Sequence, residues 1–131
     1  MQTKTCRIVI VDDHAPIREA LGHLLSSYHD LQIIGEAADG KEAIQMVDMS
    51  QPDVILMDIR MPRMNGVEAS RLIKKSWSHV VIIGLCAIND RYSIEAFMRA
   101  GATAVISKDR LEDLHATIQR ACKSKAVQMI F

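Results

Sequence analysis

The chain has 131 residues, of which 49% are hydrophobic, and its 16 lysines and arginines balance its 16 aspartates and glutamates. This length suffices for one domain with a hydrophobic core and is too short for two ordinary domains. The neutral balance gives no support for nucleic-acid contact by this domain, and no apolar run approaches the roughly 20 residues that span a membrane.

The N-terminal segment lacks the apolar region and cleavage site of a signal peptide and passes directly into a strand-like run at residues 7–11. The cysteines are odd in number, widely spaced and without a metal-ligand pattern: Cys6, Cys86 and Cys122. We interpret them as reduced thiols and predict a cytoplasmic protein.

Short runs of apolar and β-branched residues predict five strands along the chain. They lie at residues 7–11, 31–37, 54–58, 80–87 and 104–107. The third run, VILMD, is apolar up to its final aspartate, which is typical of a strand buried on both faces. Helical spacing of apolar residues predicts a helix after each strand.

Capping residues set the limits of several predicted helices. Pro16 lies near the start of the first helix, where its missing N–H costs little. Asp39 and Asn65 are each followed three residues later by a glutamate, a variant capping box that opens the second and third helices. The fourth helix is predicted over residues 90–100, with Ile94, Phe97 and Met98 facing inward, and Gly101 ends it.

The last helix is predicted to start at residues 109–112. Its apolar stripe comprises Leu111, Leu114, Ile118, Ala121 and Cys122. Five strands alternating with five helices predict right-handed βαβ units and a parallel sheet. The expected fold is therefore α/β: a flavodoxin-like, doubly wound, five-stranded parallel sheet of order 2-1-3-4-5 with five helices. We expect one domain over residues 1–125, and residues 126–131 as a C-terminal tail or the start of a linker.

Acidic residues follow two strands that this order makes neighbours. Asp12 and Asp13 end the first strand, and Asp58 ends the third. In open α/β sheets, ligands bind beyond the carboxyl ends of the strands where the strand order reverses. Two charges about 5 Å apart repel by roughly 3 kcal/mol at an effective dielectric of 20. Such a cluster either holds a proton at a raised pKa or binds a cation, and oxygen ligands suit Mg²⁺.

A lysine follows the fifth strand at the same predicted edge. The ammonium of Lys108, together with Mg²⁺ and a facing carboxylate, is an arrangement suited to phosphoryl transfer. A carboxylate can act as the nucleophile and form an aspartyl-phosphate, and we predict this role for Asp58. We interpret His14 as an exposed loop histidine that shapes the first helix, with metal ligation as the alternative.

These motifs resemble the receiver domain of two-component response regulators, over roughly residues 6 to 123. The carriers of the resemblance are the acid pair in IVIVDDH, the segment MDIRMPRMNG around Asp58, and the lysine of SKD. The DDH and GATAVISKD segments are similar to the LuxR-type transcriptional subfamily. The resemblance implies a magnesium-dependent regulatory domain, not an enzyme, that accepts a phosphoryl group on Asp58 from a histidine kinase or phosphotransfer protein.

The resemblance also implies roles for individual residues and partners. Asp13 would bind Mg²⁺ directly, Asp12 directly or through water, Asp58 through a side-chain oxygen and Arg60 through its backbone carbonyl. Lys108, and Cys86 at the position of a family hydroxyl, would contact the phosphoryl group. A homodimer is possible in this family, and the output would be transcription through a DNA-binding domain that this chain does not contain.

Two residues depart from the family pattern at positions that couple phosphorylation to movement. Cys86 stands where the family usually carries Thr or Ser, and Val105 stands where it usually carries Tyr or Phe. A thiol is a weak hydrogen-bond donor, and valine has no ring that could swing inward. We interpret both as packing residues and expect intact phosphorylation chemistry with a weakened switch.

Two alternative functions follow from other features of the sequence. Cys86 and Val105 favour a pseudo-receiver that acts as a constitutive protein-interaction module. An enzyme on the same fold, such as a flavoprotein or an aspartate-dependent phosphatase, is the other alternative. The sequence has no glycine-rich phosphate loop to support an enzyme. The position two residues after Asp58, where such a phosphatase would carry a second general acid, is occupied by Arg60.

Overall fold

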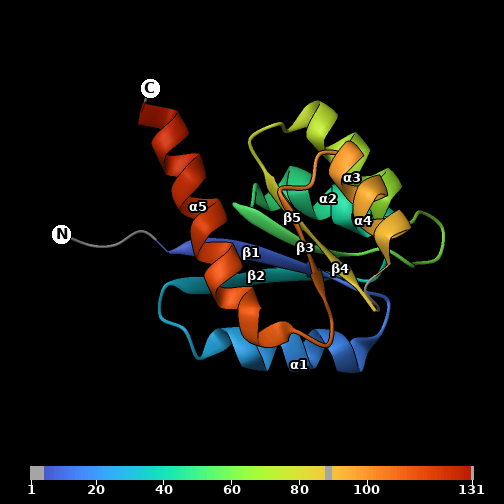
Figure 1. Cartoon of the computed structure of the whole chain (residues 1–131), viewed down its shortest axis with the longest axis horizontal. Helices are drawn as coiled ribbons and strands as arrows, with labels where there is room; N and C mark the ends of the chain where they lie inside the picture. Colours follow the sequence, from blue (N-terminus) through green and yellow to red (C-terminus); the bar gives the residue numbers. More distant parts are fainter. Residues whose placement is uncertain (1–4, 88–89, 131) are drawn as a thin grey trace.

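A five-stranded parallel sheet forms the centre of the molecule, with its strands in the order β2-β1-β3-β4-β5 (Figure 1). The computed structural model describes residues 5–87 and 90–130. The strands are β1 (Cys6–Val11), β2 (Leu31–Ala37), β3 (Val54–Asp58), β4 (Val81–Cys86) and β5 (Ala104–Ser107). The helices are α1 (Ala15–Ser26), α2 (Gly40–Ser50), α3 (Gly66–Ser76), α4 (Arg91–Arg99), the 3₁₀ turn η1 (Leu111–Asp113) and α5 (Leu114–Ile130). The predicted fold class and strand order are confirmed.

Helices cover both faces of the sheet, so the strands feed two separate cores. Side chains of β1 alternate between them: Ile8 and Ile10 pack with α1 and α5, whereas Val9 and Val11 pack with α2, α3 and α4. The central strand β3 is buried along its whole length. Its continuous apolar run is therefore what a strand covered on both faces requires.

The predicted capping residues begin α2 and α3. The side chain of Asp39 accepts a hydrogen bond from the Glu42 N–H, and that of Asn65 accepts one from the Glu68 N–H, each at 2.9 Å. The start of α3 also packs against the end of β3, because a Cβ at Gly66 would overlap the carbonyl oxygen of Asp58. This close approach fixes the loop that follows Asp58.

Some predicted details differ from the structure. Met98 is 48% exposed instead of facing inward, because the buried side of α4 carries Ser93 and Phe97 and continues to Ala100. The last helix starts at Leu114, since residues 111–113 form a 3₁₀ turn. Residues 126–130, which we expected in a tail or linker, continue α5, and residue 131 lies outside the described residues. The division of the chain at residue 125 stays a prediction.

The prediction of three reduced thiols is wrong for two of them. Cys6 and Cys122 form a disulfide between residues 116 positions apart, and Cys86 is the free, buried cysteine among the described residues. The reason is topological: α5 begins after the carboxyl end of β5 and runs back across the sheet, so its later turns reach the first residue of β1. None of the described helices combines the length and the apolar character that a bilayer crossing needs.

Candidate functional site

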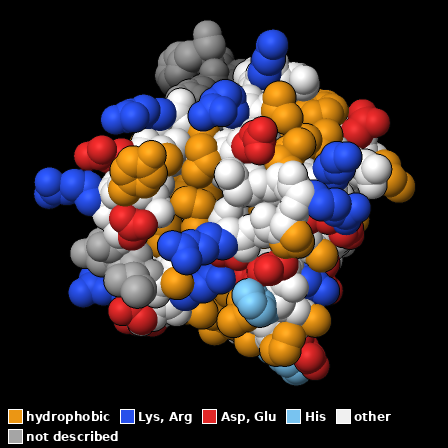
Figure 2. Space-filling model, turned by 90° about the vertical axis from the view of Figure 1, so that its right-hand side faces the viewer, with side chains coloured by type: hydrophobic (Ala, Val, Ile, Leu, Met, Phe, Trp, Pro, Cys, Tyr) orange, Lys and Arg blue, Asp and Glu red, His pale blue; other side chains and the backbone are white. Residues whose placement is uncertain are grey.

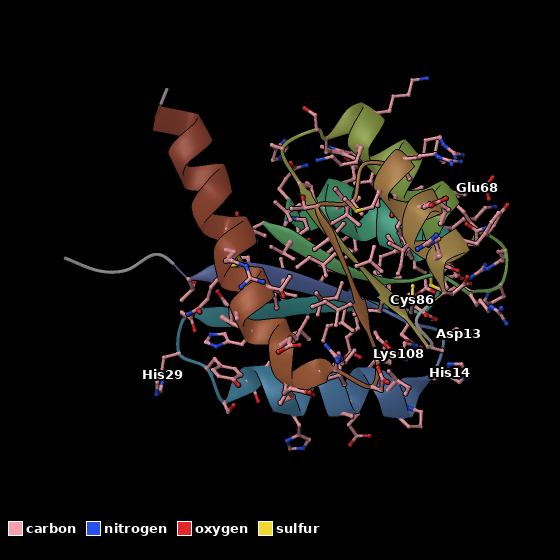
Figure 3. All side chains as sticks on the ribbon, viewed as in Figure 1. Asp13, His14, His29, Glu68, Cys86 and Lys108 are labelled. Carbon is pink, nitrogen blue, oxygen red and sulfur yellow. A yellow bond between two sulfur atoms is a disulfide. The ribbon has the colours of Figure 1, made fainter. Side chains whose placement is uncertain are left out.

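The predicted site residues gather at the carboxyl ends of the strands. Figure 3 shows Asp13, His14, Cys86 and Lys108 at this end of the molecule, with His29 on the opposite side. The same end, viewed from outside in Figure 2, has acidic, basic and histidine side chains next to one another in its lower centre. Since β1 and β3 are neighbours in the sheet, the aspartates that follow them are brought to one edge, as predicted.

Lys108 joins the two buried aspartates. Its Nζ lies 2.8 Å from Oδ2 of Asp12 and 3.1 Å from Oδ1 of Asp58. The backbone N–H of Lys108 donates to the carbonyl of Cys86 at 2.7 Å, which holds the residue beside the end of β4. The lysine side chain can therefore reach across β4 and place its ammonium between strands β1 and β3.

Asp12 is held from several directions. Its side chain is fully buried, Oδ1 accepts a hydrogen bond from the backbone N–H of His14 at 2.9 Å, and Oδ2 contacts Lys108. Its own N–H donates to the carbonyl of Ala37 at 3.1 Å. Asp12 is thus a fixed carboxylate at the floor of the site.

Asp13 and His14 form the outer part of the site. The Asp13 side chain is 28% exposed, and its Oδ1 lies 2.9 Å from Nδ1 of His14. Asp12, Asp13 and His14 each offer one possible metal-ligand atom, and these atoms lie within 4.8 Å of one another. The side chain of His14 is 66% exposed, and its carbonyl accepts the first helical hydrogen bonds of α1. His14 therefore has the position predicted for a loop histidine and remains near enough for the alternative, metal ligation.

The two partners at the centre have shifted pKa values. Burial, followed by the negative charge of Asp12, raises the pKa of Asp58, although Lys108 opposes this shift. Burial alone would lower the pKa of Lys108, but its hydrogen bonds to Asp12 and Asp58 and their charges outweigh burial and raise it. The lysine thus stays an ammonium, whereas ionising Asp58 is made harder.

The charges of the site do not balance. Asp12 and Asp58 contact the one ammonium, that of Lys108, whereas Asp13 lies beside His14. When all three carboxylates are ionised and His14 is neutral, these groups carry an excess of two negative charges. The ligand atoms of the carboxylates are oxygens, which hard divalent cations such as Mg²⁺ prefer. The residues present therefore fit a divalent metal ion in charge and in chemistry.

A cavity of about 450 Å³ opens beside Asp58. Its lining includes His14, Arg60, Cys86 and Lys108, but neither Asp12 nor Asp13. Asp58 is therefore the carboxylate of the cluster that faces this space. Arg60 lies where the prediction needs it, in the loop after β3, while the role of its carbonyl as a ligand stays a prediction.

Cys86 forms a wall between this cavity and a second one. The second cavity, of about 630 Å³, lies between α4, β5 and α5 and is lined by both Cys86 and Val105. Cys86 is 2% exposed, and burial, followed by the charges of Asp90 and Asp58, raises the pKa of its thiol. The thiol therefore stays protonated, and the small side chain of Val105 leaves open space behind it.

The sequence interpretation missed two polar residues of the cavity, Asp90 and Ser93. Asp90 caps α4 by accepting a hydrogen bond from the Tyr92 N–H at 3.1 Å, and the hydroxyl of Ser93 donates to its other oxygen at 2.6 Å. These bonds, the one from Ser93 first, lower the pKa of Asp90. The predicted range of the fourth helix, residues 90–100, began at Asp90, but the sequence did not indicate that this helix start lines the cavity.

Comparisons with known proteins agree with this geometry. The response regulator receiver domain family matches residues 8–119. The chain is 32% identical over 128 residues to the uncharacterized transcriptional regulatory protein YxjL of Bacillus subtilis, covering 97% of this chain and 59% of the relative. It is 34% identical over 103 residues to the transcriptional regulatory protein DegU of Brevibacillus brevis, covering 79% of this chain and 44% of the relative.

A solved structure is similar over almost the whole fold. The response regulator domain of Thermotoga maritima CheB superposes with a TM-score of 0.84 at 32% identity, covering 92% of this chain and 98% of that domain. The chain spans about half the length of the curated relatives it matches. The likeness is therefore to one domain of those proteins.

Proposed function

The chain belongs to the response regulator receiver domain family, and from this premise we propose that it accepts a phosphoryl group on Asp58. The observation that carries the proposal is the position of Lys108, whose ammonium contacts both Asp12 and Asp58. This geometry places a positive charge beside a carboxylate that faces a cavity. Phosphoryl transfer needs such an arrangement, because negative charge on the phosphoryl oxygens must be neutralised.

Asp58 is the best placed of the three carboxylates to act as the nucleophile. Asp12 is fully buried, with its two oxygens bonded to His14 and Lys108. Asp13 pairs with His14 and does not line the cavity. Asp58 alone among them combines contact with Lys108 and access to the cavity, so it is the proposed phosphoacceptor.

The proposed donor is a phosphohistidine of a histidine kinase or a phosphotransfer protein. A carboxylate oxygen of Asp58 attacks the phosphorus, an O–P bond forms and the P–N bond breaks, with its electron pair returning to the donor imidazole. The Lys108 ammonium neutralises charge on the phosphoryl oxygens during this transfer. Burial favours the protonated form of Asp58 by raising its pKa, and protons compete with Mg²⁺ for the same carboxylate, so uptake should fall on acidification.

We propose that Asp12, Asp13, the side chain of Asp58 and the backbone carbonyl of Arg60 hold Mg²⁺. The ion would supply positive charge that offsets the carboxylate repulsion and the charge of the phosphoryl oxygens. The negative excess of the acidic cluster supports this assignment. The exposed imidazole of His14, next to Asp13, is the alternative ligand.

The consequence of phosphorylation is proposed to be a weak conformational switch. Cys86 stands beside the cavity with a protonated thiol, a poor donor to a phosphoryl oxygen. A ligand shifts an equilibrium only by its differential affinity for the two states, so a weaker bond gives a smaller shift. Val105, which lines the other cavity, has no ring to move toward Cys86. Movement of β4, α4 and β5 should therefore be small.

The relatives suggest the setting in which this domain acts. YxjL and DegU are named transcriptional regulatory proteins, so we propose an output on transcription, through a DNA-binding domain outside this chain, in the cytoplasm. A homodimer is proposed as a possible assembly. The pseudo-receiver alternative rests on Cys86 and Val105 and treats the acidic site as vestigial. The contacts among Asp12, Asp58 and Lys108 do not support it.

Phosphoryl uptake from a small phosphodonor tests the proposal. We expect the intact mass of the protein to rise by one phosphoryl group with Mg²⁺ and not with a chelator. Asp58→Asn should abolish uptake, and Asp13→Asn should raise the Mg²⁺ concentration that uptake needs. The exposed Asp48→Asn on α2 is the matched control and should behave as wild type. Uptake by Asp58→Asn equal to that of wild type would refute the proposal.

A further inference from the structure

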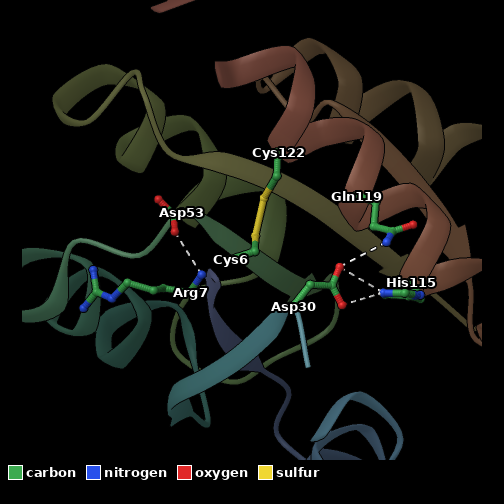
Figure 4. The surroundings of a disulfide bond; sticks show 7 residues. All are labelled: Cys6, Arg7, Asp30, Asp53, His115, Gln119 and Cys122. Atoms are coloured by element: carbon green, nitrogen blue, oxygen red, sulfur yellow. Dashed lines mark hydrogen bonds and ion pairs between the residues drawn. A yellow bond between two sulfur atoms is a disulfide. The ribbon is translucent and has the colours of Figure 1, made fainter. Parts of the chain in front are cut away.

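A second chemically distinctive cluster lies at the amino ends of the strands, away from the acidic site. The disulfide joins Cys6, the first residue of β1, to Cys122 in α5 (Figure 4). Cys6 is 8% exposed, and Cys122 is half-buried and therefore more accessible to a reagent. The bond ties the beginning of the first strand to a late turn of the last helix.

Next to the disulfide, Asp30 holds the preceding turns of α5. Nε2 of His115 lies 3.0 Å from Oδ1 of Asp30, and Nε2 of Gln119 donates to Oδ2 at 3.1 Å (Figure 4). His115, Gln119 and Cys122 are spaced by four and three residues, so they share one face of the helix. The backbone carbonyl of Asp30 also accepts a hydrogen bond from the Cys6 N–H at 2.8 Å.

These contacts divide α5 into two parts. The first part is held without the disulfide, because Leu114, Ile118 and Ala121 are buried in the core and His115 stacks on Tyr28 with ring centroids 3.6 Å apart. The part that follows Cys122 lies beyond these anchors. Among the described contacts, the disulfide is therefore the last one along α5 that attaches the helix to the sheet.

We propose that Cys6 and Cys122 form a reversible redox-modification site that fastens the C-terminal turns of α5 to the sheet. The reactants are low-molecular-weight thiols and disulfides. The reversibility rests on the cytoplasmic location proposed above, because disulfides in that compartment are usually transient, catalytic or redox-sensing. Reduction releases the backbone after Cys122 and leaves the domain folded.

The oxidation proceeds by two thiol–disulfide exchanges. The thiolate of Cys122, the more exposed of the two residues, attacks oxidised glutathione, forms a mixed disulfide and releases one glutathione thiol. The thiolate of Cys6 then attacks the Cys122 sulfur, the protein disulfide forms and the second glutathione thiol leaves. Two electrons pass to glutathione, and the two thiol protons of the protein are balanced by those of the released thiols.

Counting thiols by intact mass tests the chemistry. The protein is equilibrated with oxidised glutathione or with dithiothreitol under native conditions, then denatured with an alkylating reagent. We expect one alkylated cysteine, Cys86, after oxidation and all three cysteines after reduction. The matched control, Cys86→Ser, should show no alkylated cysteine after oxidation and two after reduction. Three alkylated cysteines after the glutathione treatment, or a bond that dithiothreitol cannot reduce in the native protein, would overturn the proposal.

Hydrogen–deuterium exchange of the oxidised and reduced wild-type protein tests the consequence. Reduction should speed backbone exchange after Cys122 more than exchange in β1 to β5, whose core amides open only by global unfolding. Unchanged exchange in α5, or an increase in the sheet as large as that after Cys122, would contradict the two-part helix. Phosphoryl uptake is a separate readout at the other end of the sheet and should be the same in both forms. Absence of uptake from both forms would refute the proposed function while leaving the redox site intact.

Discussion

The two ends of the sheet treat the same residue type in opposite ways. At the carboxyl ends, burial and the charge of Asp12 raise the pKa of Asp58. At the amino ends, burial also acts on Asp30, but hydrogen bonds from His115 and Gln119 outweigh it and lower the pKa of Asp30. At the carboxyl ends, the carboxylates of Asp12 and Asp58 repel each other and share Lys108. At the amino ends, Asp30 is hydrogen-bonded to α5, and a disulfide joins β1 to the same helix. The comparison teaches that the carboxyl end depends on one lysine to hold its buried carboxylates, whereas several separate contacts hold the amino end.

Removing Lys108 should produce the largest effect, because it leaves two buried carboxylates without their cation. Lys108→Ala should lower the free energy of unfolding by about 3–5 kcal/mol, the usual cost of breaking a buried ion pair. Urea denaturation measures this loss, and Lys75→Ala on the exposed side of α3 is the matched control. A loss no greater than that of the control would show that Lys108 does not stabilise the carboxyl end.

Breaking the disulfide should have the next largest effect. Cys122→Ser should lower the free energy of unfolding of the oxidised protein by about 2–4 kcal/mol. Without the cross-link, the unfolded chain gains conformational entropy, and this favours unfolding. Thermal unfolding with and without dithiothreitol measures this difference. The wild type should lose its advantage over the variant once reduced, and an advantage that survives reduction would assign the stabilisation to something other than the bond.

Neutralising Asp58 should stabilise the protein. Asp58→Asn removes a buried charge and its repulsion with Asp12, so the free energy of unfolding should rise by about 0.5–2 kcal/mol, the usual range of stabilising substitutions. The folded-state pKa of Asp58 lies above its ordinary value of 3.8, so folding favours the protonated form and wild-type stability increases as pH falls through the raised pKa. The advantage of the variant should therefore be largest near neutral pH and shrink on acidification. A destabilised variant at neutral pH would contradict the assignment of repulsion to this end.

Neutralising Asp30 should have the smallest effect and the opposite sign. Its side chain is 39% exposed, so solvent screening limits the contribution of its contacts to below about 1 kcal/mol. Because the folded-state pKa lies below 3.8, this stability is present above pH 3.8 and is lost as pH falls through the lowered pKa. The difference between wild type and Asp30→Asn in urea denaturation should be present at neutral pH and vanish in acid. An equal difference at every pH would exclude the carboxylate as its source.

The sequence predicted the carboxyl end well because topology decides it. Asp12 and Asp58 follow or end the buried strands β1 and β3, and Lys108 follows the edge strand β5. Parallel strands place those positions at one edge of the sheet whatever the details of packing. The predicted limits of β2, β3 and β5 are confirmed for the same reason, since each is a short apolar run between clear turn residues.

The amino end could not be predicted in this way. Cys6 and Cys122 are 116 residues apart, and their pairing depends on which face α5 turns to the sheet and on where its turns cross β1. The apolar stripe placed Cys122 toward the core, but it contained no information about its neighbour there. Asp90 and Ser93 were missed as site residues for a related reason, because the direction in which α4 leaves its loop is set by packing.

Mapping the phosphoryl group tests the central claim most directly. The protein is incubated with Mg²⁺ and a small phosphodonor, the acyl phosphate is trapped by borohydride reduction to the alcohol, and the peptides are sequenced by tandem mass spectrometry. We predict that the reduced residue, a homoserine, will be found at position 58 alone. Its appearance at Asp12 or Asp13 instead, or an unmodified Asp58 in protein that has gained a phosphoryl group, would contradict the account.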